Sequence, residues 1–134
     1  MAKLEEIEGI GKAFAVKLRK AGVRSTNELL KKGATPDGRK QISKDSGISG
    51  KLILEWVNHS DLFRVKGVGE EYADLLEEAG VDTVVELAKR KAVNLLETMK
   101  TMNTKKKLVR QLPGLSNVED WISQAKKLPR AIKY

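Results

Sequence analysis

Cysteine is absent from this sequence of 134 residues, which excludes disulfides, thiol nucleophiles and cysteine-ligated zinc. Its single histidine, His59, leaves little basis for histidine-ligated metal or for histidine-dependent acid–base catalysis. The longest apolar run, Ala13–Val16, is too short for a signal peptide or a membrane span. We therefore expect a cytoplasmic protein that is not an enzyme, has no cofactor or metal, and does not partner a membrane.

Aromatic residues make up only 4% of the chain, so the core must be built from Leu, Val, Ile and Ala. Charged residues are plentiful, at 33%, and are unbalanced. The 26 Lys and Arg against 18 Asp and Glu give a net charge of +8 and a pI near 9.7. Such a balance favours anionic partners, with nucleic acid foremost.

The chain contains an internal repeat. Residues 7–33 align without a gap to residues 65–91, so that residue 7 falls on residue 65, an offset of 58. Identical positions are mostly turn glycines and small or apolar residues at helical spacing. They include the pairs Gly9/Gly67, Gly11/Gly69, Ala15/Ala73, Leu18/Leu76, Ala21/Ala79, Gly22/Gly80 and Leu29/Leu87.

Each copy predicts a hairpin, a helix, a tight turn and a second helix. In the first copy, Gly9-Ile10-Gly11 breaks the chain and a helix follows until Gly22 ends it. Ser25-x-x-Glu28 then forms a capping box for the second helix, and Thr83-x-x-Glu86 is its counterpart in the second copy.

The remaining segments predict further helices. Thr35-Pro36 opens one that runs to about Ser46, and Gly47 turns the chain into a helix carrying Trp56. Ser116 is expected to cap a helix carrying Trp121, and Thr104 to precede a helix that begins with Lys105–Lys107. The predicted fold is all-α, a compact array of short helices in two pseudo-repeated halves, 1–63 and 64–134, packed as one unit.

The hairpin pattern resembles the helix-hairpin-helix motif of DNA repair and recombination proteins. The matching residues are Ile7, Gly9, Ile10, Gly11, Ala15 and Leu18 in the first copy, and Val65, Gly67, Val68, Gly69, Ala73 and Leu76 in the second. The whole chain is similar to a bacterial and archaeal domain family of unknown function that is made of tandem helix-hairpin-helix units.

The resemblance implies binding to duplex DNA without reading its sequence, through backbone amides that contact phosphate and through nearby lysines. The residues carried over to this role are Gly9, Ile10, Gly11, Lys12, Lys17 and Lys20. Some hairpins of the motif also hold a monovalent cation on backbone carbonyls, which by position would be those of Glu5, Ile7 and Ile10.

The two copies differ in charge. Residues 10–33 carry seven bases and one acid, whereas residues 68–88 carry seven acids and no base, with Glu70 at the position of Lys12. A carboxylate there repels phosphate, so we expect the second hairpin, Gly67, Val68 and Gly69, to be structural or to face a basic protein surface. After Ala88 the chain is basic again.

Two functions remain open at this point. The first is a non-catalytic nucleic-acid-binding module, associated with the nucleoid, in which the first hairpin contacts duplex DNA. The second is a protein–protein interaction or self-association module that uses the acidic helix within residues 70–86. Trp56 and Trp121 are expected to pack in the core rather than to stack on bases.

Overall fold

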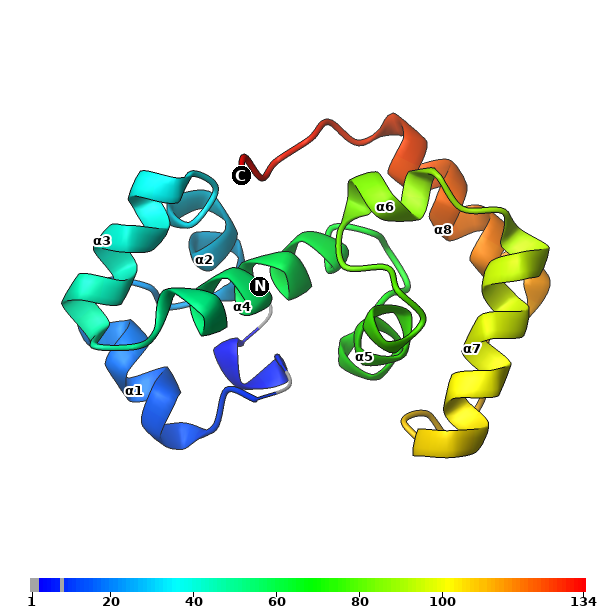
Figure 1. The fold of residues 1–134 in the computed structure, drawn as a ribbon, viewed down its shortest axis with the longest axis horizontal. Coiled ribbons are helices and arrows are strands. Elements are labelled where there is room, and N and C mark those ends of the chain that lie inside the picture. The colour runs from blue at the N-terminus through cyan, green and yellow to red at the C-terminus, as the bar shows by residue number, and fades with distance from the viewer. Residues whose placement is uncertain (1–2, 8) are drawn as a thin grey trace. The chain divides into compact units, whose positions relative to one another are not determined.

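The computed structural model describes residues 3–7 and 9–134, and the all-α prediction is confirmed across them, since they contain no strand. None of these helices is both long enough and apolar enough to cross a membrane. The elements, shown in Figure 1, are the short 3-10 helix η1 (Leu4–Glu6), α1 (Lys12–Lys20), α2 (Thr26–Lys32), α3 (Pro36–Ser46), α4 (Gly50–Leu62), α5 (Glu70–Glu78), α6 (Val84–Ala88), α7 (Ala92–Lys106) and α8 (Leu115–Lys127).

The chain divides into two compact units. Unit 1 consists of residues 1–61 together with Ala131–Tyr134, and unit 2 of residues 62–130. The division falls close to the expected boundary after residue 63, but the segment 131–134, expected in the second half, belongs to unit 1. The chain thus passes from one unit to the other twice, once at the end of α4 and once after α8.

Unit 1 is built on α1, which packs on η1 and on α3, and on α2, which also packs on α3. The predicted starts of α2 and α3 are present. The side chains of Ser25 and Thr35 accept hydrogen bonds from the amides of Glu28 (3.2 Å) and Gly38 (3.1 Å), which caps α2 and α3. The core is formed mainly by aliphatic side chains, as the composition requires, and it also includes the aromatic side chain of Trp56.

Unit 2 holds one hydrophobic cluster that runs from Leu62 to Ala125 and includes Trp121. Helix α8 packs on both α6 and α7, and α7 packs on α5. The side chain of Thr83 caps α6 by accepting a hydrogen bond from the amide of Glu86 at 3.3 Å, as predicted. Both tryptophans are 2–3% exposed, so their place in the core is confirmed.

Two predicted helix starts are wrong. Helix α8 begins two residues before Ser116 would place it, because Asn117 accepts a hydrogen bond from the amide of Gly114 (2.9 Å) and Gly114 is the N-cap. Lys105 and Lys106 end α7 rather than opening a helix, and Lys107 follows in the left-handed conformation. Cations suit this position because the last turn of a helix carries unpaired carbonyls and partial negative charge.

Candidate nucleic-acid interface

The first hairpin is a tight turn that leads directly into α1. The amide of Ile10 donates to the carbonyl of Ile7 at 3.1 Å, and Gly9 adopts a φ of +92°. Side chains other than glycine rarely take that conformation, which explains why glycine stands there. The carbonyl of Ile7, one of the three expected to hold a cation, is the acceptor in this turn.

Gly11 is the N-cap of α1 and has open space around it, with no atom within 4 Å of the position a Cβ would take. It supplies no side chain to cap the helix, and no described residue accepts a hydrogen bond from the amides of Gly11, Lys12 or Ala13. All three residues are exposed. This end of α1 therefore presents free N–H groups and the positive end of the helix dipole to solvent.

The predicted basic side chains lie on the exposed surface of the same helix. Lys12, Lys17 and Lys20 are exposed, whereas Ala15 and Leu18 are buried on the opposite side. The ammonium group of Lys17 lies 5.7 Å from the centre of the Phe14 ring, a cation–π contact. Val16 is 46% exposed and lies one helical turn after Lys12, so the lysines surround a small apolar patch.

Ile10 does not contribute a side chain to this surface. It is 4% exposed and belongs to the core of unit 1, so only its backbone is available to a ligand. Val68 is buried in the same way in the second hairpin, at 5% exposed. The hydrophobic position between the two glycines anchors each turn to its own unit.

Trp56 packs against the first hairpin on the side of the core. Its ring centre lies 5.2 Å from that of Phe14, and its Nε1 is 3.5 Å from the Cβ position of Gly9. The sequence placed Trp56 in the core but did not reveal that it packs under the turn. Spacing alone could not show this, because α4 is far from the hairpin in the chain.

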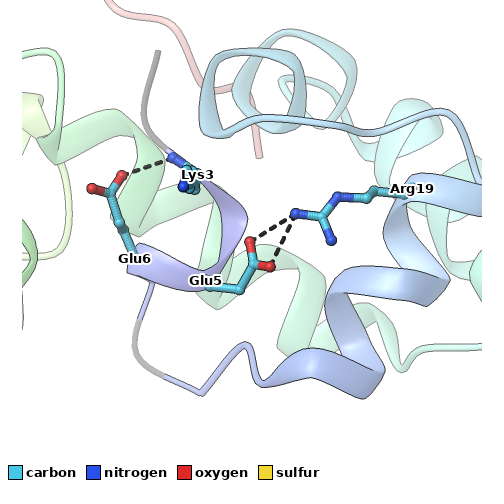
Figure 2. Close-up of polar contacts among 4 residues, drawn as sticks. All are labelled: Lys3, Glu5, Glu6 and Arg19. Carbon is cyan, nitrogen blue, oxygen red and sulfur yellow. Dashed lines mark hydrogen bonds and ion pairs between the residues drawn. The ribbon is translucent and has the colours of Figure 1, made fainter.

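Arg19 differs from the three lysines of α1 because it pairs with an acidic partner. Its guanidinium donates to both carboxylate oxygens of Glu5, at 2.8 and 3.0 Å, as Figure 2 shows. Lys32, at the end of α2, likewise donates to the carbonyl of Gly22 and pairs with Glu28 at 3.5 Å. The neighbouring Lys3 amide donates to Glu6 at 2.7 Å. These contacts fix η1 and the turns rather than add to the cationic surface.

The pKa of Glu5 reports on the contact with Arg19. A hydrogen bond from its own backbone lowers the pKa of the Glu5 carboxyl, and the hydrogen bond from Arg19 lowers it further. Because the pKa is lower in the folded state, ionised Glu5 stabilises unit 1 above its unfolded pKa, and this contribution is lost as the pH falls through the folded value. Arg19→Gln is expected to raise the Glu5 pKa, as measured by NMR titration of the carboxyl carbon.

Lys20→Gln is the matched control for that titration, since it removes the same charge from α1 at a residue with no contact to Glu5. It is expected to leave the Glu5 pKa nearly unchanged. An equal rise in both variants would mean that the overall charge of α1, and not the ion pair, holds the pKa down.

The second hairpin has the same backbone but the opposite charge. The amide of Val68 donates to the carbonyl of Val65 at 3.2 Å, and Gly67 has a φ of +96°. Gly69 is the N-cap of α5, which opens with Glu70 and Glu71. Trp121 lies beneath this turn, with its Nε1 3.0 Å from the Cβ position of Gly67 and its ring 5.2 Å from that of Tyr72.

Comparison with known proteins gives a family but no functional name. A family model described as "Domain of unknown function (DUF4332)" matches residues 8–128. No curated protein matches this chain, and no solved structure matches it.

Proposed function

The chain belongs to DUF4332, a family of domains of unknown function, and we propose that it is a non-catalytic module that binds the phosphate backbone of duplex DNA through its first hairpin. The observation that carries this proposal is the open end of α1, where the exposed Gly11, Lys12 and Ala13 have unpartnered amides beside free lysines. The proposal includes a helix-hairpin-helix origin for the turn and a place on the nucleoid for the protein.

Phosphate is the ligand that this chemistry suits. Backbone N–H groups at a helix start point at an anion, and the absence of a Cβ at Gly11 lets a bulky phosphodiester approach the chain closely. Lys12, Lys17 and Lys20 add mobile positive charge around the same point. None of these groups reads a base edge, so binding is expected to be indifferent to sequence.

Charge reversal at α1 is the test of this function. The double variant Lys12→Glu with Lys17→Glu is expected to weaken binding to a fluorescent duplex by about a hundredfold or more, because it removes two phosphate contacts and introduces repulsion. The wild-type protein is expected to lose affinity steeply with salt, with a log–log slope near −5 if about six phosphates are neutralised. Fluorescence anisotropy at two salt concentrations measures both.

Lys40→Glu with Lys44→Glu is the matched control, since it makes the same charge change at two exposed residues of α3 in the same unit. It is expected to weaken binding only slightly. Equal losses in the two double variants would show that net charge, and not the hairpin, attracts DNA. Circular dichroism of each variant confirms that the helices are retained.

The reversed charge of the second hairpin favours an alternative function. Glu70 and Glu71 stand at the start of α5 in place of Lys12 and Ala13 at the start of α1. In this alternative, α5 binds a basic protein surface, such as α1 of a second copy. Sedimentation at low and high salt separates the two proposals, because a dimer that salt dissociates, without affinity for DNA, supports the alternative.

A further inference from the structure

Unit 1 holds an extended segment of the chain, residues 131–134, against Ala34, Arg39 and Asn58, and we call this binding place the tail groove. The amide of Lys133 donates to the carbonyl of Ala34 at 2.7 Å, and Arg39 donates to the carbonyl of Lys133 at 2.8 Å. Ile132 is 3% exposed, and the hydroxyl of Tyr134 bonds the side chain of Asn58 at 3.0 Å. Figure 1 shows this tail, in red, returning to the region of α2 and α4. The contacts that hold the tail include one buried apolar side chain, one backbone hydrogen bond and two hydrogen bonds that involve the side chains of Arg39 and Tyr134.

Unit 2 repeats the helices that form this groove. The capped helices α2 and α6 are equivalent, as are α3 and α7, which follow them. Helices α4 and α8 correspond because Trp56 and Trp121 each pack under a hairpin, against Phe14 and Tyr72. The side chains of Lys32 and Arg90 also make the same contact, with the carbonyls of Gly22 and Gly80.

The equivalent groove in unit 2 is an open hollow. The N-caps Thr83 and Lys91 are two residues closer together than Ser25 and Thr35, so that Arg90, the counterpart of Lys32 when counted from the first cap, takes the place of Ala34 when counted back from the second. By the tryptophans, Asn58 corresponds to Ser123. The carbonyl of Ala34 accepts a hydrogen bond from the tail, whereas the carbonyl of Arg90 accepts none from any residue that the structure describes. The hollow is lined by Arg90, Lys91, Ala92, Glu119, Ile122, Ser123 and Lys126.

The charge of the hollow indicates what it accepts. Lys91 and Lys126 line the hollow as cations, Arg90 is a third whose guanidinium already donates to the carbonyl of Gly80 at 2.9 Å, and Glu119 is the single carboxylate among the lining residues. Such a site repels the chain's own basic tail, which carries Arg130 and Lys133, and attracts an acidic one. Arg39, which holds the carbonyl of Lys133 in unit 1, corresponds to the buried Leu95, so the donors in unit 2 are Ser123 and the two lysines.

We propose that the hollow between the start of α7 and α8 binds an extended, acidic segment of a protein partner that places one aliphatic side chain against Ile122. The tail in unit 1 is the template for this mode, in which main-chain hydrogen bonds hold the segment and one side chain fixes its register. The inference is independent of DNA binding, since it uses no residue of the first hairpin.

Three labelled peptides test the proposal on the full chain. The first, Glu-Ala-Ile-Glu-Tyr, copies residues 130–134 with acids in place of the bases, the second keeps the natural bases, and the third has Asp for Ile. The acidic peptide is expected to bind and to shift the amide resonances of Arg90, Ala92 and Ser123. The other two are expected to bind at least about tenfold more weakly, a difference of roughly 1.4 kcal/mol.

Variants locate the site. Lys126→Glu is expected to lower the affinity for the acidic peptide by about tenfold or more. Lys105→Glu, which makes the same charge change at an exposed residue of unit 2 outside the hollow, is expected to have little effect. Ser123→Phe, at an exposed position, is expected to block the hollow while the protein stays folded.

Other outcomes overturn the proposal. It fails if the acidic peptide does not bind, if the peptide with Asp binds equally well, or if the shifted resonances lie in the tail groove of unit 1. It also fails if duplex DNA, and not the peptide, shifts the amides of the hollow, because the surface would then be a nucleic-acid contact. Lys12→Glu with Lys17→Glu is expected to leave peptide binding intact.

Discussion

Gly38→Ala is expected to unfold unit 1 or to lower its free energy of unfolding by about 3 kcal/mol or more. Gly38 lies in the first turn of α3, and a Cβ there would be 2.0 Å from the carbonyl oxygen of Lys32 at the end of α2. The clash is with backbone, so no side chain can rotate to relieve it. Helix α3 would have to shift and lose the cap from Thr35, which bonds the amide of Gly38.

Urea denaturation measures this effect when only Trp56 fluoresces, in a Trp121→Phe background. Gly50→Ala is the matched control, because Gly50 is a helical glycine of the same unit with no atom within 4 Å of its Cβ position. It is expected to be neutral or to stabilise by about 0.4–1 kcal/mol. Equal stability of the two alanine variants would contradict the close approach of α2 to α3.

Trp56→Ala is expected to lower the free energy of unfolding of unit 1 by about 3–5 kcal/mol, the usual range for truncating a buried tryptophan. The indole is 2% exposed and packs against Phe14 beneath the first hairpin. Truncation to alanine leaves a cavity in the core and removes the ring that packs against the turn of the first hairpin. The variant is therefore expected to bind duplex DNA more weakly even where it stays folded. Hydrogen exchange of the α1 and α4 amides measures the stability of unit 1.

Trp56→Phe keeps a ring beneath the turn and is expected to recover most of the stability and of the DNA affinity. Trp121 fluorescence reports on unit 2 in both variants. If Trp56→Ala binds DNA less well while α1 and α4 keep their protection from exchange, Trp56 acts on the hairpin directly. Full affinity in that variant would contradict a role for the Trp56 ring.

Local signals in the sequence predicted the elements well. Four turn glycines, Gly9, Gly22, Gly67 and Gly80, are visible because a φ near +90° requires glycine. Ser25, Thr35 and Thr83 are visible as caps because their side chains accept hydrogen bonds from amides three residues ahead. The prediction that Ser116 caps α8 was wrong because Asn117, one residue later, accepts the hydrogen bond from the amide of Gly114. Competing caps within one turn cannot be ranked from the sequence.

Contacts between distant residues could not be predicted. Glycine and lysine spacing placed the candidate site at the first hairpin, but nothing in the sequence pairs Arg19 with Glu5 or separates Arg19 from the three exposed lysines of α1. The tail was missed for the same reason. Ile132 and Tyr134 carry no periodic pattern, and the contacts of Tyr134 with Arg39 of α3 and Asn58 of α4 appear only once the chain is folded.

The double passage of the chain between the units has a consequence for biosynthesis. Because residues 62–130 lie between the two parts of unit 1, the ribosome must complete all of unit 2 before Ile132 and Lys133 emerge. Unit 2 is continuous in the chain, so its residues are all synthesised before unit 1 is complete. Unit 1 lacks the buried side chain of Ile132 until the last residues have been added.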